Sequence, residues 1–134
     1  MKKKDRLFKM AGIFLLPFFF LISCHRNLKP DFSILQAKVQ LYNKFLIWQK
    51  FDDAEKMMDT GLIPAFEKTI QNKRYTSIKI IKIKPVGEGK EAEVIVKREY
   101  YYMYDNRVRK ELIKQKWKYR GKRENWVLVG EERL

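Results

Sequence analysis

The chain has 134 residues, enough for one domain, and its 46% apolar and 34% charged residues are typical of a folded globule rather than a disordered segment. Lysine and arginine total 30 against 16 acidic residues, which gives a formal net charge of +14. One cysteine and one histidine exclude an intrachain disulfide framework and the common zinc ligand sets, so we predict no metal site.

Residues 1–23 have the layout of a secretory signal peptide. A basic start, Met1 to Arg6, precedes an uncharged apolar run from Met10 to Ile22 that contains Pro17. A helix of that length spans about 20 Å, whereas the hydrocarbon core of a bilayer is roughly 30 Å thick. The run is therefore too short for a membrane-spanning helix and predicts an exported protein.

The leader ends in Leu21-Ile22-Ser23-Cys24, which resembles the lipobox of bacterial lipoproteins. The resemblance implies that the Cys24 thiol receives a diacylglyceryl group and that cleavage makes Cys24 the mature N-terminus. The protein would then be lipid-anchored to the cell membrane or outer membrane, facing the periplasm or the exterior, because two or more acyl chains anchor stably. His25 stands where inner-membrane lipoproteins carry Asp, which favours the outer membrane. The alternatives are an ordinary signal peptide or an uncleaved anchor with an incidental cysteine.

Residues 24–32 are predicted to form a short tether and residues 33–134 a single domain. Within the tether His25 follows Cys24, but a nucleophile and its base normally meet through the fold, with a third group to orient them. The domain itself contains no histidine and hence no Ser-His-Asp set. We therefore predict a non-catalytic domain that needs no cofactor.

The first part of the domain has helical patterns. Ser33 and Gln36 form a capping-box pattern for a first helix. Apolar residues then recur at helical spacing, at Leu35, Val39, Tyr42 and Leu46, and the stripe is widened by Ile34, Leu41, Phe45 and Trp48. This spacing predicts one helix with a broad buried face.

Two shorter helices are predicted next. Asp52 and Glu55 form a second capping pattern, for a helix through Met58. Gly61 suits a left-handed stop, and Pro64 suits the first turn of a third helix that continues over residues 65–72.

After Arg74 the hydrophobic period changes to two, which predicts strands over 75–84, 91–104, 108–119 and 126–130. Ile80-Ile81 breaks the alternation and predicts a β-bulge. Asp105-Asn106 is a hairpin-turn signal. Helices followed by an antiparallel meander predict an α+β domain with N-terminal helices packed on a curved antiparallel sheet.

The hairpin predicts a register. If Asp105-Asn106 is a two-residue turn, Tyr104 faces Arg107 and the paired residue numbers sum to 211. The more apolar face then carries Ala92, Val94, Val96, Arg98, Tyr100 and Tyr102, opposite Tyr119, Trp117, Gln115, Ile113, Glu111 and Arg109. The other face carries Lys110, Lys114, Lys116 and Lys118 and is predicted to meet water.

The order of elements, with Trp117, a turn at Gly121 and Trp126-Val127-Leu128 at the end, resembles the NTF2-like (cystatin-like) superfamily. The resemblance implies a sheet curled around the long helix and a cone-shaped pocket. Enzymes of that superfamily use Asp or His inside the cone. Here the domain has no histidine, and its aspartates fall at predicted caps and turns, so the resemblance implies the fold rather than an activity.

Two candidate sites follow. The first is a pocket for a small polar ligand, in which Arg98 and Glu111 are diagonal neighbours on the predicted inner face. Its candidate residues are Arg98, Tyr100, Glu111, Gln115 and Trp117. The alternative is a structural ion pair near the sheet edge.

The second candidate site is the lysine row, for contact with an anionic surface such as lipid headgroups, an envelope polymer or an acidic patch of an envelope protein. Its residues are Lys110, Lys114, Lys116 and Lys118. The alternative is a solvated strand face. Nucleic acid is not an expected partner, because an exported, tethered domain seldom meets it.

Three hypotheses from different classes remain. The chain is a lipoprotein with a non-catalytic binding or interaction domain, an NTF2-like enzyme or small-ligand binder that uses Arg98 and Glu111 in the cone, or a structural accessory of an envelope complex. A deep pocket that encloses Glu111 favours the second hypothesis. A flat apolar patch without a cavity favours the third.

Replacing the cysteine tests the anchor. We expect Cys24→Ala to abolish incorporation of labelled fatty acid and to leave unprocessed precursor, because the thiol is the only attachment point. Mass spectrometry of the protein from its native host checks this. An unmodified sulfur in the wild-type protein, or unchanged mass and membrane retention in the variant, would refute lipidation.

Overall fold

The structure is a computed structural model that describes residues 30–134. The predicted signal peptide, the lipobox, Cys24 and His25 lie outside the described residues, as does most of the predicted tether. The described part of the chain consists of helices followed by a sheet, and the predicted α+β class is confirmed.

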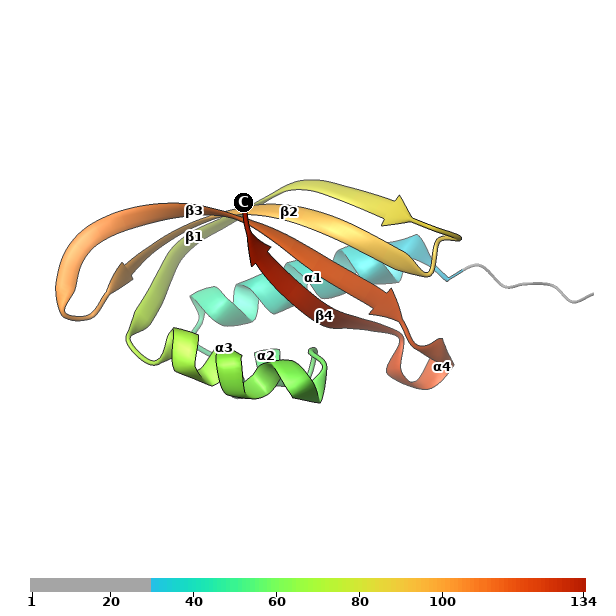
Figure 1. Ribbon diagram of the computed structural model, residues 1–134, viewed down its shortest axis with the longest axis horizontal. Coiled ribbons are helices and arrows are strands. Elements are labelled where there is room, and N and C mark those ends of the chain that lie inside the picture. The colour runs from blue at the N-terminus through green and yellow to red at the C-terminus, as the bar shows by residue number, and fades with distance from the viewer. Residues whose placement is uncertain (1–29) are drawn as a thin grey trace, which may run out of the picture.

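The sheet has four antiparallel strands in sequence order (Figure 1). The strands are β1 (Lys73–Val86), β2 (Glu91–Tyr102), β3 (Asp105–Tyr119) and β4 (Trp126–Arg133). Each connection joins two neighbouring strands, and such short connections require an antiparallel pairing. The sheet is open, so β1 and β4 are its two edges.

The helices before the sheet lie on one side of it (Figure 1). They are α1 (Phe32–Ile47), α2 (Phe51–Glu55), the 3₁₀ turn η2 (Thr60–Leu62) and α3 (Ile63–Ile70). A further short helix, α4 (Gly121–Glu124), lies in the connection from β3 to β4, where a turn was predicted. Gly121 enters it with a φ of 86°, which glycine adopts without strain.

The cap of α1 differs from the prediction. Asp31 is the N-cap, and its carboxylate accepts hydrogen bonds from the backbone N–H of Ser33 at 2.9 Å and from the Ser33 hydroxyl at 2.7 Å. The predicted Ser33–Gln36 capping box is therefore wrong. Asp31 rather than Ser33 caps the helix because a charged carboxylate oxygen is a stronger acceptor than a hydroxyl for the free N–H groups of the first turn.

The buried face of α1 is narrower than predicted, because Ile34, Leu41 and Trp48 are exposed. Its fully buried apolar residues are Leu35, Val39, Tyr42 and Leu46. The Tyr42 ring meets Trp117 of β3 edge to face, with ring centroids 5.8 Å apart. Trp117 is 1% exposed, so this contact lies in the centre of the core.

The second predicted capping box is also wrong. Helix α2 begins at Phe51, so Asp52 already lies inside it, and the N-cap Lys50 makes no side-chain hydrogen bond. Gly61 does not end a helix in the left-handed conformation but lies within η2, where its N–H donates to Asp59 at 3.2 Å. Pro64 does occupy the first turn of α3, as predicted.

The pairing of β1 with β2 contains the predicted bulge. Ile80 pairs with Val96 and Lys82 with Ile95, which leaves Ile81 as the extra residue. A second irregularity leaves Thr76 unpaired. Each extra residue increases the local bend and twist of the strand, in keeping with the arch of the sheet in Figure 1.

The predicted register between β2 and β3 is wrong by two residues. Tyr102 pairs with Asp105, so the turn is Met103-Tyr104 rather than Asp105-Asn106. The paired residue numbers along most of the hairpin sum to 209 instead of 211, because Tyr100 pairs with Arg109 beyond an irregularity.

The two-residue shift leaves every side chain on its predicted face, because the side-chain period of a strand is two. It does change the partners. Arg98 and Glu111, expected to be diagonal neighbours, are directly opposite each other, and Gln115 faces Val94.

Truncation of the central tryptophan tests the packing. We expect Trp117→Ala to lower the free energy of unfolding by about 3–5 kcal/mol, because it leaves a cavity under Tyr42. Urea unfolding checks this. Trp48→Ala is the matched control, since Trp48 is 55% exposed. Equal effects of the two substitutions would contradict the packing described above.

Candidate functional site

A pocket of about 330 Å³ lies between the inner face of the sheet and the helices. Its helical wall is formed by Leu62, Ala65, Phe66 and Thr69, and its sheet wall includes Lys73, Tyr75, Arg98, Glu111 and Ile113. Tyr42, Met58 and Leu128 also line it, and residues 131–133 of β4 form its rim. The volume is at the small end of the range for ligand sites.

Two of the five predicted pocket residues line this pocket. Arg98 and Glu111 do, whereas Gln115, Trp117 and Tyr100 are buried in the walls around it. The predicted charge pair between Arg98 and Glu111 does not occur. Each of the two side chains binds a different partner, although their Cα positions are opposite each other.

The Glu111 carboxylate is held by two cations. Lys73 donates to Oε1 at 2.8 Å and Arg133 donates to Oε2 at 3.0 Å. Burial raises the pKa of a carboxyl group, but these two hydrogen bonds outweigh it and hold the pKa of Glu111 below its usual value. Glu111 is thus ionised, with both oxygens engaged.

Lys73 is the more constrained partner. Its side chain is 5% exposed, and burial lowers its pKa although Glu111 stabilises the charged form. The ammonium also lies 3.9 Å from the centroid of the Tyr100 ring and 5.1 Å from that of Tyr75. The negative faces of the two rings replace part of the water that the ion loses.

Arg98 forms the second buried pair. Its guanidinium donates to both carboxylate oxygens of Glu131, at 3.0 and 2.6 Å, and the Arg98 side chain is only 2% exposed. Burial disfavours the charge, but Glu131 outweighs it, so the pKa of Arg98 is raised. The Nε atom of Arg98 is buried and has no hydrogen-bond partner among the described residues.

Glu131 is also bound by uncharged donors. The Tyr42 hydroxyl and the Gln115 amide each donate to its Oε1 at 3.2 Å. Gln115 further donates to Asn43 of α1 at 3.1 Å and accepts from the indole of Trp117 at 3.3 Å. A continuous polar chain therefore connects α1, β3 and β4 beneath the pocket.

Sequence reasoning missed four of the charged pocket residues. Lys73 precedes the predicted start of the first strand, and residues 131–133 follow the predicted end of the last one. The polar sequence after Gly130 carries no apolar alternation, so hydrophobic patterning ended that strand too early. The predicted inner face carries Arg98 and Arg109 against a single acid, Glu111, and this excess of positive charge was the available signal that a further carboxylate had to come from elsewhere.

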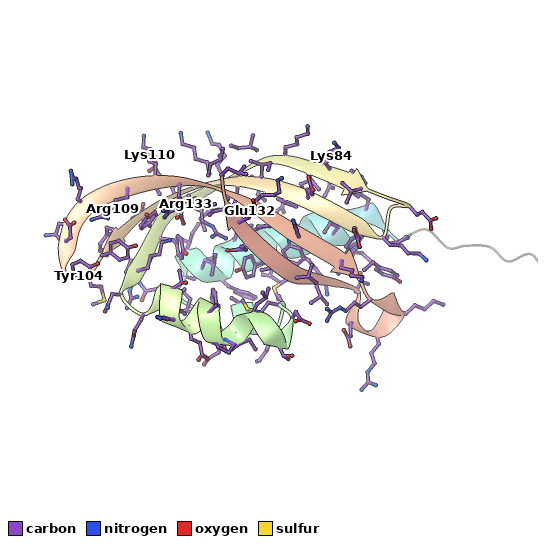
Figure 2. The ribbon with its side chains drawn as sticks, in the orientation of Figure 1. Lys84, Tyr104, Arg109, Lys110, Glu132 and Arg133 are labelled. Carbon is purple, nitrogen blue, oxygen red and sulfur yellow. The ribbon has the colours of Figure 1, made fainter. Side chains whose placement is uncertain are left out.

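The tyrosines at the end of β2 form a second feature. Tyr100 meets Tyr102 edge to face with ring centroids 5.6 Å apart, and Tyr102 stacks on Tyr104 with centroids 5.3 Å apart. Tyr104 is 75% exposed in the turn, and Arg109 lies over the Tyr102 ring at 5.0 Å. Figure 2 shows Tyr104 and Arg109 at the end of the hairpin.

The predicted lysine row lies on the opposite face of the sheet from the pocket. Lys110, Lys116 and Lys118 are exposed and Lys114 is half-buried. Figure 2 shows Lys110, together with Lys84 of β1, on the side of the sheet away from the helices.

Residues 30–134 contain no group of three or more His, Cys, Asp and Glu side chains that could hold a metal ion. No helix in this same range is long and apolar enough to cross a membrane. Comparison with known proteins gives no match to a family model, to a curated protein or to a solved structure.

Neutralising the pocket carboxylate tests the buried cluster. We expect Glu111→Gln to lower the free energy of unfolding by about 3 kcal/mol at neutral pH, because it leaves the Lys73 ammonium buried without a counterion. Urea unfolding measures the loss, and the exposed Glu88→Gln is the matched control.

The loss depends on pH. A depressed pKa in the folded state contributes stability above the ordinary pKa of a glutamate, about 4.3, and this contribution is lost as the pH falls through the folded-state value. The wild-type protein and Glu111→Gln should therefore converge in stability in acid. A difference that stays constant down to low pH would contradict the ion pair.

Proposed function

We propose that the chain is a lipid-anchored bacterial lipoprotein whose domain binds a small polar ligand in the cell envelope without transforming it. In this proposal residues 1–23 direct export, Cys24 carries the acyl chains that hold the protein at the cell or outer membrane, and the pocket beneath the sheet is the binding site. The sequence supports the anchor, and the pocket supports the binding role.

The observation that carries the binding role is the state of the charged groups in the pocket. A general base needs a free lone pair and a general acid needs a transferable proton. Both oxygens of Glu111 accept hydrogen bonds from cations, and Arg98 is paired with Glu131. Fixed, mutually compensated charges orient a polar ligand but offer little for proton transfer, so this arrangement favours binding over an NTF2-like enzyme.

We further propose that the domain has the NTF2-like fold. Three helical segments precede a four-stranded antiparallel meander, and a pocket lies between the sheet and the helices. Trp117 and Trp126, which the resemblance to this superfamily uses, are both 1% exposed. These features support the assignment because the order of elements and the position of the pocket both match those of the NTF2-like superfamily.

A structural role in an envelope complex is the second candidate, and one observation favours it. Ile34, Leu41 and Trp48 follow one another at intervals of seven residues along α1 and its C-cap, and all three are exposed. Seven residues are about two helical turns, so these side chains form an apolar stripe on one face. Such a stripe suits contact with another protein.

Filling the pocket tests the proposed binding role. We expect small polar compounds, screened as sugars, amino acids, dicarboxylates and nucleosides, to raise the melting temperature of the wild-type chain. Ala65→Trp should abolish that shift, because Ala65 lines the pocket at an exposed position of α3 and the larger side chain fills the space.

Ala37→Trp is the matched control, since Ala37 is exposed on α1 and does not line the pocket. A shift that persists in Ala65→Trp would place the ligand elsewhere. No shift with any compound, together with loss of a co-purifying protein in Trp48→Ala, would favour the structural role.

A further inference from the structure

The outer face of the sheet gathers more lysines than the row on β3. The strand pairing places Lys79 beside Lys97, Lys82 and Lys114 on either side of Ile95, and Lys84 and Lys116 on either side of Glu93. The complete set of outward lysines is Lys79, Lys82, Lys84, Lys97, Lys110, Lys114, Lys116 and Lys118. Three strands from different parts of the sequence therefore build one basic surface, which we call the basic face.

Acidic residues compensate this charge only in part. By the strand register the outward glutamates are Glu91, Glu93, Glu99 and, on β4 beside the pocket rim, Glu132, half as many as the lysines. Among residues 30–134, one ion pair forms on this face, between Lys110 and Glu99 at 3.8 Å. On the basic face lysines thus outnumber glutamates by four.

The arrangement is repulsive within the folded protein. Lys79 and Lys97 are direct cross-strand neighbours, and like charges in that position destabilise a sheet. Neighbouring strands are about 5 Å apart and alternate residues about 7 Å, both within the roughly 10 Å over which salt screens charges. A sheet face that only needed solubility would gain stability from alternating signs, so the concentration of one sign points to an anionic partner.

Apolar side chains lie within the same surface. Leu112, opposite Lys97, is 38% exposed, and the bulge residue Ile81 is 54% exposed. Ile95 lies between Lys82 and Lys114. Lysines that surround a few apolar side chains match the boundary between headgroups and acyl chains in a bilayer.

We propose that the basic face lies against a lipid bilayer that contains anionic lipids. The face extends in two dimensions over three strands, as a planar partner requires, and its apolar residues suit a bilayer better than a fully hydrated polymer. The pocket is on the other side of the sheet, so docking of the basic face leaves the pocket open to the aqueous compartment.

The proposed anchor strengthens this contact without being required for it. Pro30 is six positions after Cys24, and an extended chain of that length spans at most about 20 Å. If Cys24 carries lipid, the basic face is held at high effective concentration beside the membrane, so individually weak attractions suffice. Only this gain in effective concentration rests on the proposed function.

A lysine-reactivity footprint on the full chain tests the proposal. The chain is reconstituted in vesicles of phosphatidylcholine alone or of phosphatidylcholine with phosphatidylglycerol, pulsed with an amine-acetylating reagent and read by mass spectrometry. We expect the lysines of the basic face to react roughly fivefold more slowly in the anionic vesicles, a factor that corresponds to about 1 kcal/mol. Lys44, Lys56, Lys68 and Lys122, exposed elsewhere, should react equally in both. High salt should remove the protection.

Two quadruple variants with the same change in net charge sharpen the test. The first replaces Lys79, Lys97, Lys114 and Lys116 by Gln, and the second replaces Lys44, Lys56, Lys68 and Lys122 by Gln. In the first variant the remaining lysines of the basic face should lose their protection, while thermal unfolding is unchanged or shifted upward because repulsion is relieved. In the second variant the protection should persist.

Equal reactivity in the two kinds of vesicle, or equal behaviour of the two variants, would overturn the proposal. Protection by soluble peptidoglycan fragments but not by anionic vesicles would also overturn it, in favour of a polymer partner. The footprint reports how the domain is oriented on the vesicle, not whether the chain is retained there. An unmodified Cys24 would therefore refute the anchor, whereas only the reactivity of the lysines decides whether the basic face contacts the bilayer.

Discussion

The burial of Arg98 under the sheet is the constraint on which the rest of the inner face depends. A guanidinium that is 2% exposed is stable only beside a carboxylate, and Glu131 supplies one through two hydrogen bonds. To reach it, β4 must continue beyond its last apolar residue, and this extension also brings Arg133 to Glu111. Two ion pairs thus fix the last strand and form one wall of the pocket.

The sequence was sufficient for features that depend on local periodicity. The centre of the apolar stripe of α1, the two faces of β2 and β3 and the bulge at Ile81 all follow from spacings within a single element. The width of the α1 stripe does not, because Ile34, Leu41 and Trp48 are exposed where no other element covers them. The hairpin register did not follow, because two neighbouring dipeptides can both form its turn. The stacking of Tyr102 on Tyr104 and the ion pair of Arg109 with Asp105 accompany the observed turn, and neither is visible in an alternation pattern.

The charged pocket was predicted only in part, because its contacts join distant parts of the chain. Lys73 and Glu111 are 38 positions apart, and Arg98 and Glu131 are 33 apart. A strand pattern shows that Arg98 faces inward but not which carboxylate meets it, since that choice depends on the relative positions of β1, β3 and β4. The same limit hid the lysines of β1 on the basic face.

The open sheet leaves two edges, and each is protected against pairing with a second copy of the chain. The edge of β4 is covered near Leu128, whose backbone exchanges hydrogen bonds with Met57 and Asp59. The edge of β1 carries lysines, Pro85 and two bulges, all of which disrupt a template for strand addition. A high local concentration of chains favours filament formation by strand addition, and these irregularities oppose the growth of a continuous β-ribbon from neighbouring molecules.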